Sequence, residues 1–259
     1  MGRLSGRVAL VTGASRGLGR VLALGLANEG AAVAVVARSR PRLEEVAAEI
    51  RTRGGRSAAI VADQMDGEAV QASVRQAVEA LGPVDVLVNN AGENDMGPFT
   101  QTDPLEWWRL VELNLRGPYL YCRAVLGEMI RRRWGRIINI GSVASKIGVP
   151  NASAYATAKH GLIGLTRSLA LEVAKQGITV NAICPAWMPT DMTAHTTRQR
   201  AQLAGLSFEA MVSEMQRRIP RGTSADVADM VPFVLFLASE ESGWMTGEAM
   251  NTSGGQVMH

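Results

Sequence analysis

The chain has 259 residues, of which 47% are hydrophobic and 20% charged, so it can bury the core of one large domain. A net charge of +3 and the lack of any apolar run near roughly eighteen residues argue against nucleic-acid binding and a membrane span. We therefore expect a soluble, cytoplasmic protein. Cys122 and Cys184 show no metal-like spacing, so free buried thiols and no metal site are predicted.

Short apolar runs alternate with longer helical patterns along the chain. Strands are predicted over 8–11, 32–36, 57–61, 84–88, 136–140 and 179–183, and helices over 17–28, 41–53, 67–81, 104–132 and 154–175. This alternation predicts one α/β domain over 1–259, a Rossmann-type doubly wound parallel sheet with helices on both faces. The basic run 131–136 is interpreted as a solvated helix end, because cations complement the helix dipole there.

A glycine-rich turn follows the first predicted strand, with the spacing Gly-x3-Gly-x-Gly. Glycines at such a turn let backbone amides approach a pyrophosphate at a helix N-terminus. The alternative is a plain structural turn. The residues predicted to bind a dinucleotide here are Gly13, Ser15, Arg16, Gly17, Leu18 and Gly19.

The end of the second strand favours NADP(H) over NAD(H). It carries Arg38, Ser39 and Arg40 where a carboxylate would repel a 2′-phosphate, and Arg16 can face the same place. The alternative is that these arginines are solvated charges. Asp63, followed by Gln64, ends the third strand and is predicted to contact the adenine, although an ordinary loop aspartate explains it as well.

Tyr155 and Lys159 are four residues apart in a helix-forming segment, about 6 Å along one helix face. An ammonium beside a phenol favours the phenolate, so the pair predicts a tyrosine that exchanges protons near neutral pH. The alternative is a surface pair on an amphipathic helix.

A polar insertion interrupts the rhythm after the sixth strand. The segment over about 186–222 has the position of a substrate-covering lid, and a surface excursion is the alternative.

Taken together, these motifs resemble the short-chain dehydrogenase/reductase family over essentially the whole chain, near 3-oxoacyl-thioester reductases and ketoreductases. The resemblance implies that Tyr155 is the general acid and base, and that Lys159 lowers its pKa and holds the nicotinamide ribose. It implies that Ser142 orients the substrate oxygen and that Asn114 holds a water linked to Lys159.

The resemblance also assigns the rest of the cofactor site and the pocket walls. It places Asn90, Ala91 and Gly92 beside the adenosine ribose, and Pro185, Met188 and Thr190 near the nicotinamide carboxamide. Glu93, Val149 and Trp187 are expected to contact substrate, with the alternative that residues 93–95 only cap the next loop. Ala186 stands where the family often has glycine, so a strained turn is expected there.

The resemblance implies NADP(H)-dependent interconversion of a ketone, 3-oxoacyl or other, and a secondary alcohol. A polyol or hydroxy-acid dehydrogenase and a catalytically silent dinucleotide sensor are the alternatives. The family usually forms homotetramers, or dimers, through the helix after Tyr155 and the region 246–255, where Ser253 replaces a frequent acidic residue. The expected partner is a small carbonyl or alcohol substrate.

Overall fold

The computed structural model describes residues 2–259 and contains one seven-stranded, wholly parallel sheet. The strands lie in the order β3-β2-β1-β4-β5-β6-β7. Their bounds are β1 (Val8–Thr12), β2 (Ala32–Ala37), β3 (Ser57–Val61), β4 (Val86–Asn89), β5 (Gly135–Ile140), β6 (Ile178–Pro185) and β7 (Ala249–Thr252). The chain winds outward from β1 to β3 and then outward from β4 to β7, so the winding reverses between β1 and β4. Ligands of open α/β sheets bind at the carboxyl ends of the strands beside such a reversal.

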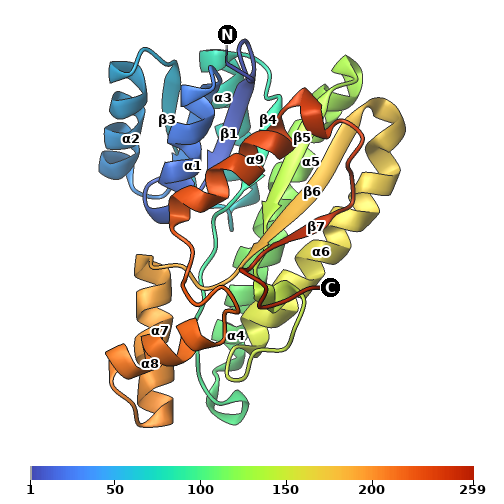
Figure 1. Cartoon of the computed structure of the whole chain (residues 1–259). Helices are drawn as coiled ribbons and strands as arrows, with labels where there is room; N and C mark the ends of the chain where they lie inside the picture. Colours follow the sequence, from blue (N-terminus) through green and yellow to red (C-terminus); the bar gives the residue numbers. More distant parts are fainter. Residues whose placement is uncertain (1) are drawn as a thin grey trace.

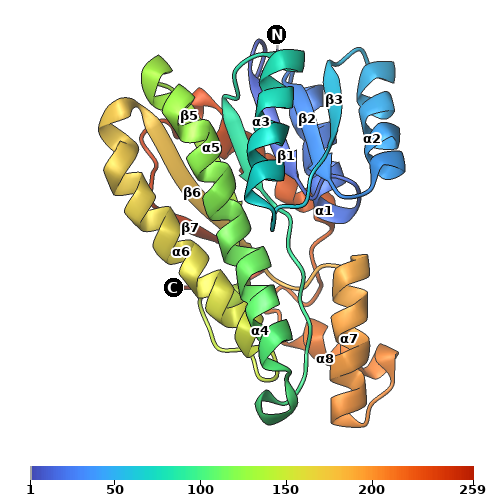
Figure 2. The same ribbon diagram turned by 180° about the vertical axis from the view of Figure 1, so that it is seen from behind.

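Helices cover both faces of the sheet. One face carries α1 (Gly17–Asn28), α2 (Arg40–Thr52) and α9 (Val231–Ala238), as Figure 1 shows. The opposite face carries α3 (Gly67–Leu81), α5 (Gly117–Arg132) and α6 (Ser153–Val173), seen in front in Figure 2. The predicted doubly wound architecture is confirmed.

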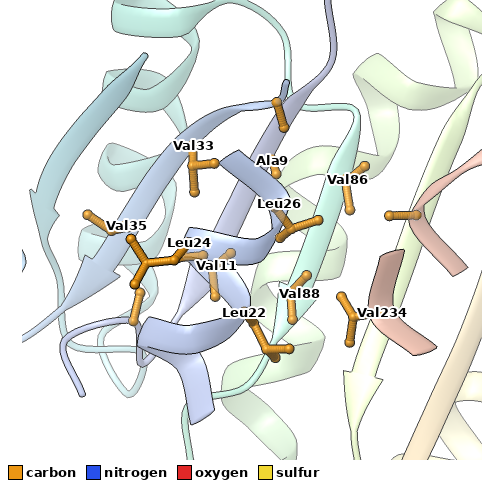
Figure 3. Close-up of a cluster of buried hydrophobic side chains, with 14 of the residues drawn as sticks. Ala9, Val11, Leu22, Leu24, Leu26, Val33, Val35, Val86, Val88 and Val234 are labelled. Carbon is orange, nitrogen blue, oxygen red and sulfur yellow. The ribbon is translucent and has the colours of Figure 1, made fainter. Parts of the chain in front are cut away.

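The central strands β1, β2 and β4 are buried on both faces, which explains why they are nearly continuous apolar runs. Ala9 and Val11 of β1 pack with Leu22 of α1 on one face, where Figure 3 shows them gathered with valines of β2 and β4. The alternate residues Val8 and Leu10 belong to the cluster on the other face. Helices therefore pack against the central strands from both faces, and this packing fixes the position of their carboxyl ends.

The predicted long helix over 104–132 is interrupted. It consists of α4 (Pro104–Val111), a π-helical turn (Glu112–Arg116) and α5. Pro118 has no N–H to donate to the carbonyl of Asn114, so the α-helical ladder is broken at this point. The wider turn carries Asn114, which is fully buried.

Two further helices, α7 (Asp191–Ala204) and α8 (Phe208–Arg217), occupy the predicted lid segment. They pack on each other beyond the ends of the strands and stand apart from the layered body (Figure 1). The hydroxyl of Thr190 caps α7 by accepting from the backbone N–H of Thr193. Within residues 2–259, no helix is both long and apolar enough to cross a membrane.

Candidate active site

A cavity of about 530 Å³ opens at the carboxyl ends of the strands, beside the reversal of the winding order. Its size is that of a pocket for a cofactor or a small ligand. Except for Arg40, the residues predicted for the cofactor, the chemistry and the substrate all line this cavity. Arg42 lines the cavity in place of Arg40.

The glycine turn is shaped by its backbone and by the lack of side chains. Gly13 and Gly17 have φ values of +64° and +53°, which favour glycine, and a Cβ on Gly19 would overlap the carbonyl oxygen of Gly13. Asn90 donates from Nδ2 to the carbonyl of Thr12 at 2.9 Å and so ties this turn to the loop after β4. These residues fit a dinucleotide pyrophosphate at the start of α1.

The arginines at the cofactor end are paired with carboxylates. Arg38 lies 2.7 Å from Glu93, which also contacts Arg109 at 3.0 Å, and Arg16 lies 3.3 Å from Asp191 of α7. The carboxylate of Glu93 is therefore shared by two guanidiniums. The sequence predicted a contact of Glu93 with substrate but not these two ion pairs.

Asp63 and Gln64, both predicted to bind the cofactor, line the cavity and also support its loops. Gln64 donates from Nε2 to the carbonyls of Leu113 and Ala91, at 2.7 and 3.2 Å. Asp63 accepts from the backbone N–H of Met65 at 3.0 Å. Gln64 thus holds the π turn against the loop after β4.

The turn after β6 is not strained. The non-glycine residues with positive φ among 2–259 are Arg133 and Asn151, so Ala186 adopts an ordinary backbone conformation. The expected strain at Ala186 is wrong, because this turn does not use the left-handed region.

Tyr155 and Lys159 lie on the buried side of α6. The Lys159 ammonium lies 5.5 Å from the centre of the Tyr155 ring and donates to the carbonyl of Ile140 at 2.7 Å. The surface alternative for this pair is wrong, since only 9% and 5% of the two residues are exposed. Ser142 follows β5 and accepts from the backbone N–H of Ala144 at 3.2 Å.

Burial controls the pKa values of both groups. It raises the pKa of Tyr155 to about 12, although a hydrogen bond with Ser142 acts in the opposite direction. It lowers the pKa of Lys159 to about 8. The expected lowering of the Tyr155 pKa by Lys159 is not found in the protein alone, because desolvation of the phenolate dominates.

Asn114 reaches the site from the π turn. Its Nδ2 donates to the carbonyls of Leu110 and Glu93, both at 2.8 Å, and its Oδ1 is buried without a partner among residues 2–259. A Cβ on Gly92 would lie 2.6 Å from this oxygen and 3.8 Å from the Lys159 ammonium. Gly92 therefore leaves open the space between the two side chains.

The lid side of the cavity holds residues that motifs did not indicate. Arg200, Met215, Arg218 and Gln256 line it, while Trp187 donates from Nε1 to Thr197 at 3.1 Å. Val149 packs against the cluster that contains Tyr155. No motif marks Arg200, and only its place in the polar insertion pointed toward the site.

Several relatives of this chain are named as oxidoreductases. The family model for short chain dehydrogenase matches residues 7–201. Oxidoreductase UcpA of Escherichia coli is 38% identical over 259 residues, all of this chain and 97% of that protein. The 3-oxoacyl-[acyl-carrier-protein] reductase FabG of Staphylococcus aureus is 39% identical over 251 residues, 96% of this chain and 98% of that protein.

A solved structure shows the same likeness in three dimensions. The structure of a tryptophan variant of actinorhodin polyketide ketoreductase with NADPH matches this chain with a TM-score of 0.94. The two sequences are 36% identical, and the match covers 99% of both chains. Sequence and fold thus agree over nearly the full length of the molecule. The chain belongs to the short-chain dehydrogenase family and is an oxidoreductase.

Proposed function

We propose that the protein is an NADP(H)-dependent reductase that converts a small ketone to a secondary alcohol, with Tyr155 as the proton donor. The observation that carries this proposal is the buried Tyr155, paired with Ser142 and neighboured by Lys159, at the wall of a cavity that begins at the glycine turn. The named relatives include a 3-oxoacyl reductase and a polyketide ketoreductase, which act on ketones.

The protonated state of Tyr155 suits the proton donor that ketone reduction requires. With a pKa of about 12, the phenol keeps its proton at neutral pH and can donate it to a carbonyl oxygen as negative charge develops. The Ser142 hydroxyl donates to the same oxygen and orients it. A bound reduced nicotinamide supplies the hydride.

Lys159 and Asn114 restore the proton. Burial lowers the pKa of Lys159 to about 8, so both its ammonium and its neutral amine are populated near neutral pH. The side chain can therefore pass a proton toward Tyr155. The partnerless Oδ1 of Asn114 faces the space kept open by Gly92 and can accept from a proton carrier beside Lys159. The two residues form a route between the phenol and the cavity.

The arginine pair supports NADP(H). Arg16 and Arg38 line the cavity, and Ser39 rather than a carboxylate follows Arg38 at the end of β2. Two guanidiniums suit a 2′-phosphate, which would displace their present carboxylate partners. Arg38→Asp should weaken NADPH binding at least about tenfold and leave NADH binding equal or improved. Unchanged NADPH affinity would exclude this cofactor role.

A substrate panel with NADPH and NADH in parallel, followed by loss of reduced-cofactor absorbance, tests the function. We expect turnover of ketones with NADPH preferred. Turnover confined to the oxidation of polyols or hydroxy acids would favour the dehydrogenase alternative. Cofactor binding with no turnover of ketones, oxoacyl thioesters or polyols would favour the silent sensor.

We also infer a homotetramer in the cytoplasm. An apolar groove on α4, α5 and α6 is lined by Trp108, Val111, Leu115, Tyr119 and Leu165, and Trp108 is 61% exposed. An exposed tryptophan and tyrosine beside an apolar groove suit a subunit interface. The two buried, unpaired cysteines fit a reducing compartment.

A further inference from the structure

Arg200 of α7 lies close to the proposed chemistry. Its Nη2 is 3.8 Å from the sulfur of Met96, and Met96 belongs to the small buried cluster that contains Tyr155 and Ala144. Arg200 also lines the cavity together with Trp187. The guanidinium therefore reaches the lid side of the substrate space, one side chain away from the proton donor.

The guanidinium has no carboxylate partner. Every other arginine in residues 2–259 is either exposed or within 4.0 Å of a carboxylate, whereas Arg200 is half-buried and forms no such pair. A buried charge without a counterion is unfavourable, and arginine does not lose its proton to relieve it. Arg200 is thus a cation that lacks an anion.

The nearby carboxylates are engaged elsewhere. Asp95, on the same loop as Met96, accepts from Gln199 and lies 3.4 Å from His195. Asp191, at the start of α7, pairs with Arg16. None of these acids neutralises Arg200, so its guanidinium is free to pair with an anion that enters the cavity.

Burial and a neighbouring positive charge both disfavour the charged form of Arg200. Burial lowers the pKa of Arg200, and the positive charge of Arg218 lowers it further. Arg218 lines the same cavity and shares Glu214 with Arg217, at 3.1 and 3.0 Å. An anion bound between Arg200 and Arg218 would relieve both effects.

We propose that Arg200 binds the carboxylate of the substrate, so that the enzyme acts on small keto acids. A planar guanidinium receives a carboxylate through two parallel hydrogen bonds, which would also fix the distance of the ketone from Tyr155. The buried amide oxygens of Asn94 and Gln256, in the same cavity wall and without partners among residues 2–259, can accept from substrate hydroxyls. This proposal rests on the reductase function proposed above.

The test compares Arg200→Met with wild type on matched acid and ester substrates. Methionine keeps an unbranched apolar side chain beside Met96 and removes only the charge. The control is Arg198→Met on the same helix, because Arg198 is exposed and does not line the cavity. The substrates are acetoacetate and levulinate, each with its methyl ester, and dihydroxyacetone phosphate represents a phosphate anion.

Loss of a charge-assisted bond of about 1.5–3 kcal/mol corresponds to a rise of roughly 10- to 100-fold in KM for the keto acids. The KM values for the esters and the dissociation constant of NADPH should stay within about twofold, and Arg198→Met should behave like wild type. An equal loss for acids and esters, or a wild-type preference for the esters, would overturn the carboxylate assignment. Activity confined to the phosphate substrate and lost in Arg200→Met would reassign the anion.

A binding measurement separates this proposal from the proposed reductase activity. Calorimetric titration of acetoacetate into the wild-type protein with NADPH present should show binding that Arg200→Met weakens by the same factor. Binding without turnover would refute the reductase and keep the anion site. Turnover of ketones with no binding difference between wild type and Arg200→Met would refute the anion site and keep the reductase.

Discussion

Glu93 pairs with Arg38, the guanidinium that we propose binds the 2′-phosphate of NADPH, so the carboxylate would compete with that phosphate. Their carboxylate and guanidinium lie 2.7 Å apart, and both side chains are partly exposed, so the pair contributes at most about 1 kcal/mol. Glu93→Gln frees Arg38 and removes a negative charge from its surroundings. We therefore expect NADPH to bind about two- to fivefold more tightly and NADH binding to change less.

Fluorescence titration of the reduced cofactors measures this effect. Glu106→Gln is the control, because Glu106 pairs with Arg109 and not with Arg38. Equal NADPH affinities in wild type and Glu93→Gln would show that the pair does not compete with the cofactor.

Lys159 gives a pH dependence of stability with a defined sign. Burial depresses its folded pKa to about 8 from the ordinary value of 10.5, so the charged form destabilises the fold below pH 8. Lys159→Met removes that charge. The variant should be more stable than wild type below about pH 8, by at most about 3 kcal/mol.

This advantage should disappear as pH rises from about 8 to about 10.5, since the unfolded chain then also loses its proton. Urea unfolding of both proteins across this range measures the difference. Lys175→Met is the control, because Lys175 is exposed and should show no such trend. A Lys159→Met advantage that grows with pH would contradict the burial argument.

At the scale of elements, the approach of α1 to the glycine turn depends on the missing side chain of Gly19. A Cβ there would overlap the carbonyl oxygen of Gly13 and crowd the Asn90 amide. Gly19→Ala should destabilise the fold by about 1–3 kcal/mol and abolish tight cofactor binding, because the helix start is pushed away from the turn.

Gly127→Ala is the matched control within a helix. Gly127 is exposed on α5 with nothing within 4 Å of a Cβ, so alanine there should stabilise by up to about 1 kcal/mol. Thermal unfolding and NADPH titration measure both variants. A Gly19→Ala protein with normal cofactor affinity would show that close packing of this helix is not needed for binding.

Periodicity and motifs predicted the elements well where local rules decide the structure. The strands β1 to β6 and the glycine turn follow from apolar patterning and glycine chemistry. The four-residue spacing of Tyr155 and Lys159 correctly placed the pair on one helix. The π turn was not predicted, because Pro118 lies inside an otherwise helical pattern. The local pattern does not show how the backbone rearranges around the carbonyl that loses its hydrogen-bond donor.

Contacts between distant segments could not be predicted from local patterns. The bridge from Arg38 through Glu93 to Arg109, and the contact of Arg200 with Met96, join residues from separate loops and helices. The pKa of Tyr155 also depends on burial by such segments. The sequence shows Lys159 but not these surrounding segments, so it could not indicate that burial raises the pKa of Tyr155 in the protein alone.

At the scale of the whole molecule, the apolar groove between α4, α5 and α6 predicts assembly. Trp108→Glu puts a charge into a surface that we expect a second subunit to cover, which opposes association. Light scattering should give the wild type four times the mass of one chain, and the variant a smaller assembly. Leu203→Glu on α7 is the control, since Leu203 is exposed and does not line the groove. A monomeric wild type, or an unchanged mass in Trp108→Glu, would contradict this interface.

Proton donation by Tyr155 is the central step of the proposed reaction. The decisive measurement is the rate of NADPH consumption with a ketone substrate in wild type and Tyr155→Phe, with NADPH affinity measured for both. Phenylalanine keeps the ring packed beside Met96 and Ala144 and removes only the hydroxyl. We predict a fall in kcat of about 10²- to 10⁴-fold at unchanged NADPH affinity, the usual contribution of a general acid. A Tyr155→Phe protein that reduces the ketone at the wild-type rate would contradict the mechanism.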